Sequence, residues 1–410
     1  MTTTDTDQET LPRFPPPRDN PLDPPPLLLE YQRTNPVAPM AMAEGKPAYI
    51  VTRFEDCRQV LLSDAFSSDP ARPGYPRVLL SHSTFSSAGQ LHHLDPPEHD
   101  HYRRMLAPEF LIRRVEALKP AIDASVNQLI DTMIDEGPVA DLITKLTMPV
   151  PAIVTCTLLG VPYERSDYFV GLVDTFLGGW ATPEQVKEGR AELRALLGDL
   201  IKERTAEPAE DLLSRVIVAQ VQPGNLDPEI LLNLAELLLA AGFDTTHNTI
   251  GLGILALLQN PDQLDLLKSD WSLIDGAVEE ILRHQTVPQF GRLRVVARDI
   301  EIIGHQFHEG DGVIAALDIA NRDPSVFPNP HQLDIKRGQP HLGFGYGIHQ
   351  CLGAMFARIE LRSTISTLFQ RIPDLRLAVP FSELDFKWNA PVFGLKAMPV
   401  TWDTTVGKAG

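Results

Sequence analysis

The chain has 410 residues, and its 43% hydrophobic and 22% charged residues are typical of a globular protein. The 36 Lys and Arg against 54 Asp and Glu give a net charge of −18. A surface this acidic repels nucleic acid and anionic lipid, so we expect neither as a partner. Cys57, Cys156 and Cys351 are far apart in the sequence, which argues against a disulfide framework or a CxxC zinc site and fits a reducing cytoplasm.

The opening of the chain predicts an extended segment. The first 40 residues are dense in proline, which interrupts helices and sheet ladders, so we expect a proline-rich lead docked on the body of the protein. No basic region followed by an apolar run stands in MTTTDTDQETLPRF, so we expect neither a secretory signal nor a membrane anchor. The protein is therefore expected in the cytoplasm.

Periodicity along the rest of the chain predicts mostly helix with a small amount of sheet. Residues 46–54 alternate like a strand, and strand signals cluster again at 293–317 and 383–402. Helical spacing begins in FEDCRQVLLS and dominates residues 110–270, whereas the turn formers at 66–92 predict a long loop. Because neither an internal repeat nor a Gly/Ser linker is present, we expect a single domain.

The longest helix candidate runs from Pro228 to Asn260 and would be roughly 48 Å long at about 1.5 Å per residue. Its apolar run LAELLLAAGF ends at DTTHN and is too short for a membrane span, so we expect a buried core helix. Burial of the acid and the hydroxyls of DTT in this apolar helix costs free energy unless these groups have hydrogen-bond partners or a function. Threonine hydroxyls can bond back to the helix backbone and open it locally; the alternative is that DTT marks a helix end and its cap.

A glycine-rich segment around the last cysteine carries the sharpest signal. In HLGFGYGIHQCLGAMFARIEL (341–361), glycines at 343, 345 and 347 precede Cys351, and a predicted helix follows. Glycines let backbone approach a flat cofactor, and amide groups near a helix start favour a thiolate, which can bind iron. The alternative is a buried structural cysteine in a glycine-rich turn.

The segment FGYGIHQCLG resembles the haem-binding loop of the cytochrome P450 family, FxxGxxxCxG with a basic residue two places before the cysteine. The resemblance implies that Cys351 is the axial ligand of the haem iron and that Phe344 lies against its sulfur. It also implies that His349 faces a haem propionate and that Gly353 belongs to the cofactor site. Thiolate ligation implies oxygen activation, because it pushes electron density to the iron and favours O–O cleavage.

The family carries an acid and alcohol pair in its long helix, and AAGFDTTHN (240–248) is similar to it. The resemblance implies that Asp244 brings protons inward and that Thr245 steadies the activated oxygen. Gly242 would leave space for the ligand. His247 and Thr246 receive no role.

Further motifs extend the resemblance over nearly the whole chain. VEEILRH places Glu280 and Arg283 at the family's ExxR spacing, and Arg337 ends a segment similar to the meander that completes this structural charge network. HHLDPPEHDHYRRML resembles the family's propionate helix. This implies that His99 and Arg103 bind propionate, with Arg294 as another basic contact. A metal site made by the histidines at 92, 93, 99 and 101 is the alternative.

The resemblance implies a single cytochrome P450 domain over 1–410, mainly α with small β-sheets, as a triangular helical prism enclosing haem b. The expected activity is insertion of one oxygen atom from O2 into an apolar small molecule of secondary metabolism. The alternatives are oxidative coupling or cyclisation, or a haem protein that binds gas or transfers electrons. Electrons would come from NAD(P)H through a separate ferredoxin or flavodoxin with its reductase, and we expect a monomer. The expected substrate pocket is apolar and consists of Leu80, Phe85, Phe176, Trp180, Ala240, Val287, Phe290 and Phe393.

Overall fold

The computed structural model describes residues 11–78, 90–162, 165, 168–169, 171–172, 175 and 181–403. The chain forms two compact units, and each is described by itself. The first unit comprises Met1–His101, Leu282–Gln332 and Gln339–Cys351, and the second comprises Tyr102–Ile281, Leu333–Gly338 and Leu352–Gly410. The prediction of a single domain over 1–410 stays a prediction.

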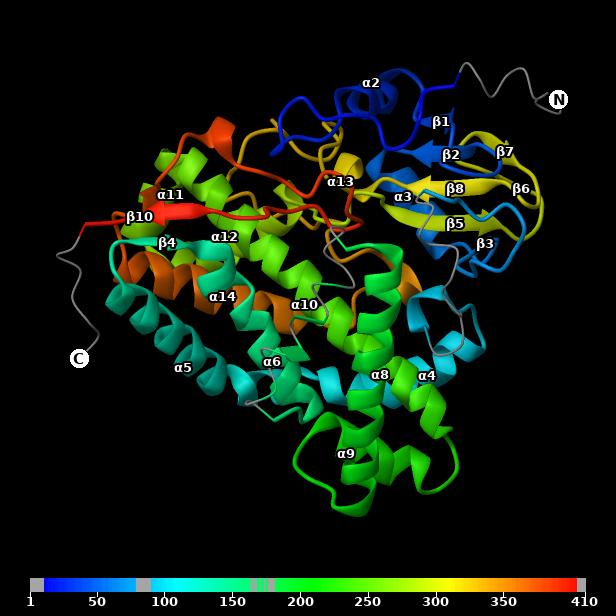
Figure 1. The fold of residues 1–410 in the computed structure, drawn as a ribbon. Coiled ribbons are helices and arrows are strands. Elements are labelled where there is room, and N and C mark those ends of the chain that lie inside the picture. The colour runs from blue at the N-terminus through cyan, green and yellow to red at the C-terminus, as the bar shows by residue number, and fades with distance from the viewer. Residues whose placement is uncertain are drawn as a thin grey trace. The chain divides into compact units, whose positions relative to one another are not determined.

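The first unit is built on a five-stranded sheet in the order β1-β2-β8-β5-β3 (Figure 1). β2 and β8 are parallel, with Ala48 opposite Gly312, and the other neighbours are antiparallel. Aromatic side chains fill its core, where Phe307 contacts Phe66 edge to face. The strands and a separate hairpin are β1 (Val37–Met40), β2 (Ala48–Val51), β3 (Phe66–Ser67), β5 (Arg292–Val296), β8 (Gly312–Ala315), β6 (Ile300–Ile302) and β7 (His305–Phe307).

Two short helices of this unit follow different sequence signals. The predicted helix after residue 53 is confirmed as α3 (Phe54–Leu62), whereas α2 (Pro26–Thr34) lies inside the lead that we expected to be extended throughout. That expectation is wrong for this segment because Pro26 stands in the first turn, where its missing N–H costs nothing, and no proline follows in LLLEYQRT. α13 (Leu317–Ala320) follows β8 directly.

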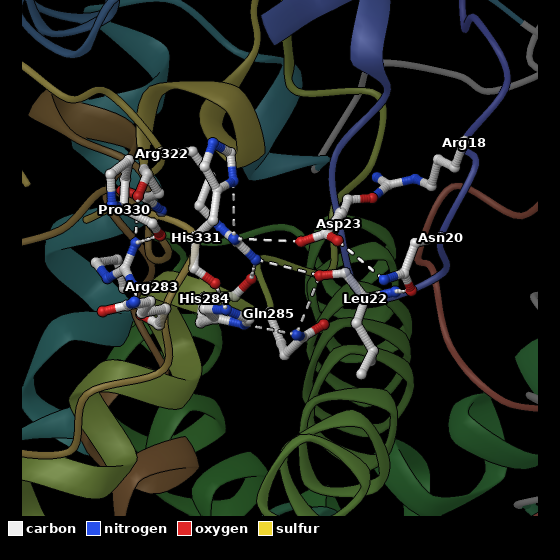
Figure 2. A network of polar contacts seen from close by, with 12 residues as sticks. Arg18, Asn20, Leu22, Asp23, Arg283, His284, Gln285, Arg322, Pro330 and His331 are labelled. Atoms are coloured by element: carbon white, nitrogen blue, oxygen red, sulfur yellow. Dashed lines mark hydrogen bonds and ion pairs between the residues drawn. The ribbon is translucent and has the colours of Figure 1, made fainter. Parts of the chain in front are cut away.

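The rest of the proline-rich lead is tied to the first unit. Phe14 donates its N–H to the Ala41 carbonyl at 2.9 Å, and its buried ring contacts Phe290. Figure 2 shows how Leu22 and its neighbours join the network around the buried guanidinium of Arg322. Arg322 donates to the Leu22 carbonyl at 3.1 Å and to the His284 carbonyl at 2.8 Å. The lead thus supplies hydrogen-bond acceptors to a buried cation.

The second unit is organised around α10 (Pro228–Gln259). The helix begins where the Asp227 side chain accepts a hydrogen bond from the Glu229 N–H, with Pro228 at the first position, and it ends at Asn260 before a proline. Contacts with α10 come from α6 (Pro149–Leu159), α8 (Pro183–Ala206) and α14 (Ala354–Arg371), and α5 (Ile112–Glu136) packs against α14 and α6 (Figure 1). The long buried core helix is therefore confirmed.

Smaller elements complete the second unit. A three-stranded antiparallel sheet has the order β4-β10-β9, with Val400 of the central strand opposite Ala140 and Leu377. Within the described part of the chain, none of the helices has the length and apolar character that a membrane crossing requires. The remaining elements are β4 (Val139–Asp141), β9 (Arg376–Leu377), β10 (Pro399–Thr401), α9 (Leu212–Val216) and α11 (Pro261–Ser269). Two further helices, α4 (Glu98–Leu106) and α12 (Ile274–His284), each contain residues of both units.

Candidate functional site

The cysteine loop of the first unit is shaped by glycines. Gly345 and Gly347 have φ of 72° and 71°, a conformation that other residues rarely adopt. A Cβ on Gly347 would stand 2.5 Å from the Leu61 carbonyl oxygen, so a side chain has no room there. Cys351 donates its N–H to the Phe344 carbonyl at 2.9 Å, which closes the loop. The loop presents Cys351 with its side chain exposed.

The other two thiols are in a different environment. Cys57 and Cys156 are 0% and 2% exposed. Burial raises the pKa of the Cys57 thiol well above its usual range and raises that of Cys156 to about 12. Buried neutral thiols are poor metal ligands. Cys351 is therefore the thiol whose surroundings permit ligation, and the alternative of a buried structural cysteine is wrong.

Basic side chains gather near this loop in the first unit. His99 is 1% exposed, and its ring lies 4.4 Å from that of His349 between centroids. The His349 Nε2 is 3.0 Å from the Ser68 hydroxyl. Arg294 on β5 is 5% exposed, and burial lowers the pKa of its guanidinium to about 10. Three of the predicted propionate contacts thus lie in one unit.

Two observations indicate that this group can bind a further anion. The Nε2 of His99 is buried and has no hydrogen-bond partner among the residues that the structure describes. A buried arginine with a lowered pKa is a cation whose desolvation is poorly compensated. A carboxylate would satisfy both, so the group fits haem propionates. Arg103 is half-buried and lies one helical turn after His99 on α4, on the same helix face.

Sequence analysis did not identify two residues of this region, Arg292 and Tyr75. Arg292 lies on β5 two positions before Arg294, so both side chains point to the same face of the sheet. Burial lowers the pKa of Arg292, and the charge of Cys351 acts in the opposite direction. Burial raises the pKa of Tyr75 to about 12, although the charges of Arg294 and Arg292 act in the opposite direction. The alternation RLRVV was the signal that could have identified Arg292.

The alternative of a metal site made by the four histidines receives no support. The described residues include no group of three or more His, Cys, Asp or Glu side chains placed to hold a metal ion. Gly353 is the N-cap residue of α14, and a Cβ added to it would meet no atom of the described residues within 4 Å.

The acid and alcohol pair lies in the second unit, in the middle of α10. Asp244 is 5% exposed and Thr245 is half-buried. The Thr245 hydroxyl donates to the Ala241 carbonyl at 2.8 Å, as we expected, but the helix is continuous and the predicted local opening is wrong. A carbonyl oxygen has two lone pairs, so it can accept the hydroxyl in addition to the helical N–H. DTT is likewise not a helix end.

Gly242 has a packing role. A Cβ on Gly242 would stand 2.9 Å from the hydroxyl oxygen of Thr155 on α6. The space that this glycine leaves is therefore taken by the neighbouring helix, which corrects the expectation that it is reserved for a ligand.

A buried polar cluster surrounds Asp244 in the second unit. Its Oδ1 accepts a hydrogen bond from the Asn248 side chain at 2.9 Å and lies 3.2 Å from the His247 Nε2. The same Nε2 is 3.4 Å from the Nζ of Lys387. Sequence analysis assigned no role to His247 and did not identify Lys387, which is 143 positions after Asp244 in the chain. The polar residues that continue after DTT were the available signal for His247.

The predicted charge network is partly visible in the contacts. The two carboxylate oxygens of Glu280 accept hydrogen bonds from the Arg337 Nε at 3.1 and 3.2 Å, and both side chains are buried within the second unit. In the first unit Arg283 donates to the Asn321 carbonyl at 2.7 Å and to the Pro330 carbonyl at 3.0 Å. These contacts suit structural roles.

The predicted pocket residues fall into three groups. In the first unit, Val287 and Phe290 are each 5% exposed, and Phe290 also belongs to a core cluster. In the second unit, Ala240 is half-buried on α10, and the ring of Phe393 is stacked on that of Phe386. Their roles as pocket residues stay a prediction. Leu80, Phe85, Phe176 and Trp180 lie outside the described residues.

Comparisons with known proteins agree with one another. The family model described as Cytochrome P450 matches residues 182–373. Cytochrome P450-SU2 of Streptomyces griseolus is 38% identical over 390 residues, covering 93% of this chain and 94% of that protein. Pentalenic acid synthase of Streptomyces avermitilis is 38% identical over 391 residues, covering 95% and 97%. The crystal structure of CYP105P1 in complex with filipin I has a TM-score of 0.90 at 36% identity, covering 96% and 99%.

Proposed function

Because the chain belongs to the cytochrome P450 family, we propose that it inserts one atom of O2 into an apolar small molecule, with hydroxylation as the expected outcome. Family members are monooxygenases that use O2 and a haem whose iron is bound by a thiolate. The predicted fold, mainly α with small sheets, is confirmed by the likeness to solved structures. The exposed Cys351 on its glycine-shaped loop is the observation that carries the proposal.

The first unit offers residues for each part of a haem, and we propose that the group is haem b. Cys351 would bind the iron, and the Nε2 of His99, unpartnered among the described residues, and the buried guanidinium of Arg294 would bind propionate oxygens. We assign the same role to His349 and Arg103. When bound, the haem supplies an iron that activates O2, and the thiolate pushes electron density toward it. The charge of Arg292 acts on Cys351 and favours its thiolate form.

We propose that Asp244 and Thr245, both on α10, supply protons to the oxygen chemistry. The Thr245 hydroxyl gives its hydrogen to the Ala241 carbonyl, so its oxygen lone pairs are left to accept a hydrogen bond. An acceptor fixed in this way can hold an incoming O–H group in one orientation. Asp244, buried and hydrogen-bonded by Asn248, is the nearby group that can take up and release a proton.

Bacterial members of the family generally take electrons from ferredoxin-type proteins and act on small molecules. We propose that a separate ferredoxin or flavodoxin with its reductase delivers electrons from NAD(P)H. We further propose a single-domain monomer in the cytoplasm.

We propose a secondary metabolite as the substrate. Two relatives support this: one is named for the synthesis of pentalenic acid, and another was crystallised with filipin I. Apolar side chains such as Phe393 and Val287 would contact the substrate and set its orientation.

Isotope labelling tests the reaction. Substrates that convert the ferric haem to high spin are turned over under 18O2, and the product is analysed by mass spectrometry. The proposal predicts one 18O atom per product molecule and no label from H218O. A coupled or cyclised product without 18O would instead show that the oxygen is reduced to water and would overturn the proposed insertion.

A further inference from the structure

The polar cluster around Asp244 brings side chains of α10 together with Lys387 from a distant part of the chain. Asp244, His247 and Asn248 are spaced i, i+3 and i+4 on α10, so their side chains share one face of the helix. Residues 385–396 form a hairpin in which Phe386 pairs with Leu395, and its Lys387 side chain lies beside this face of α10. A Cβ on Gly394 would stand 1.7 Å from the Asn248 Oδ1, and Gly394 accepts the Lys387 N–H at 2.8 Å. The hairpin thus fixes the lysine backbone beside the helix.

One nitrogen lies at the centre of the cluster. The Nε2 of His247 is 3.2 Å from the Asp244 Oδ1, 3.0 Å from the Asn248 Nδ2 and 3.4 Å from the Lys387 Nζ. The ammonium and the amide nitrogen can only donate, whereas an ionised carboxylate can only accept. A protonated Nε2 suits Asp244, and an unprotonated Nε2 suits Lys387 and Asn248. The proton therefore has two places, on Nε2 or on Oδ1, with little movement of heavy atoms.

Because the cluster is buried, the position of this proton decides which charges interact there without screening by water. His247 is 0% exposed, Asp244 is 5% and Lys387 is 9%, so water screens the cluster weakly. If Nε2 carries the proton, an imidazolium lies next to the ammonium of Lys387. If Oδ1 carries it, the acid and imidazole are both neutral and Lys387 is the remaining cation. Repulsion between these two cations at 3.4 Å disfavours the arrangement with the proton on Nε2.

Titratable groups on the neighbouring elements do not compete for this proton. Burial raises the pKa of Cys156 on α6 and of Glu360 on α14, so their charged forms are disfavoured. On α8, Arg190 and Arg194 pair with Glu236. The ammonium of Lys145, in the π-helical turn Ile143–Thr147 that also contacts α10, pairs with Glu136 at 2.6 Å.

We propose that His247 is the proton relay behind Asp244 and that Lys387 is the positioning residue that drives the relayed proton onto the acid. After Asp244 gives up its proton, a proton from water binds the Nε2 of the neutral His247. The Nε2–H bond then breaks and an Oδ1–H bond forms, so the imidazolium becomes neutral again and the carboxylate becomes the acid. This role rests on the proposed function, because Asp244 would supply protons to the oxygen chemistry.

The test uses the holoenzyme labelled with 15N-histidine, reduced and bound to carbon monoxide so that the iron is diamagnetic. The carbon monoxide spectrum of every variant is recorded first, which checks thiolate ligation separately. The 15N shift of the His247 Nε2, assigned with His247→Gln, reports where the proton lies. Lys387→Met is expected to move this shift toward the protonated value. The matched control is Lys396→Met, in the same region but exposed and paired with Asp385, and it leaves the shift unchanged.

Turnover gives a second readout. Lys387→Met and His247→Gln are expected to lower the product formed per O2 consumed by about tenfold or more, with the balance released as hydrogen peroxide. Lys396→Met keeps the wild-type ratio. If the Nε2 shift and the ratio are the same in Lys387→Met as in Lys396→Met while the thiolate spectrum is intact, the proton relay is wrong and the proposed function stands. If the thiolate spectrum is absent from the wild type, the proposed function itself fails.

Discussion

Removing one partner of the buried ion pair between Glu280 and Arg337 is expected to destabilise the second unit strongly. The two side chains are 1% and 6% exposed and share two contacts, at 3.1 and 3.2 Å. Glu280 also accepts the Asp334 N–H at 2.9 Å. Glu280→Ala removes the acceptor of this N–H and leaves the Arg337 cation buried without its carboxylate. Breaking one side of such a pair costs about 3–5 kcal/mol.

The free energy of unfolding, measured by urea denaturation at equal haem saturation, checks this value. The matched control is Asp385→Ala, which breaks the exposed pair with Lys396 and is expected to cost about 0–1 kcal/mol. The double variant Glu280→Ala with Arg337→Met removes the uncompensated charge and should recover part of the loss. A loss for Glu280→Ala no greater than that of the control would refute the reasoning from burial.

Three further predictions concern the first unit. Arg294→Met should lower the affinity for haem, measured by haem transfer to apomyoglobin. It should also raise the Tm of the apoprotein, measured by calorimetry, because it removes a buried cation whose pKa burial lowers to about 10. Gly347→Ala should destabilise the cysteine loop by about 1 kcal/mol or more, seen as faster haem loss, since φ is 71° and Leu61 blocks a Cβ. Burial lowers the pKa of His284 well below 6.5, so the unfolded chain binds a proton that the folded protein does not, and stability falls as the pH drops below about 6.5. Urea titrations of the wild type and His284→Gln should show that the variant lacks about 1.4 kcal/mol of this loss per pH unit.

Much of the fold could be predicted from local signals. Hydrophobic periodicity predicts α10 and α3, and alternation predicts β2, β5 and β8, because each of these elements places apolar side chains in the core. The prediction from composition was wrong for α2, because the effect of a proline depends on its position within a helix. Proline density suggested extended chain throughout the lead, but a proline in the first turn is compatible with α2.

The candidate site was predictable only where its residues form a motif in sequence. Cys351 and Asp244 stand in short segments whose pattern carries their chemistry. Lys387 could not be predicted, since its role depends on a hairpin that packs on α10 far along the chain. Likewise, the Leu22 carbonyl that Arg322 binds lies 300 positions away (Figure 2). Long-range polar contacts of this kind leave no periodic trace in the sequence.

The axial ligand is the central claim, and the absorption spectrum of the reduced protein with carbon monoxide tests it most directly. Wild-type protein and Cys156→Ala, which removes a buried thiol, should both show the far-red-shifted Soret band of a thiolate-bound haem. Cys351→Ala should lose that band. A histidine-type spectrum that is the same in all three proteins, or no bound haem at all, would contradict the account.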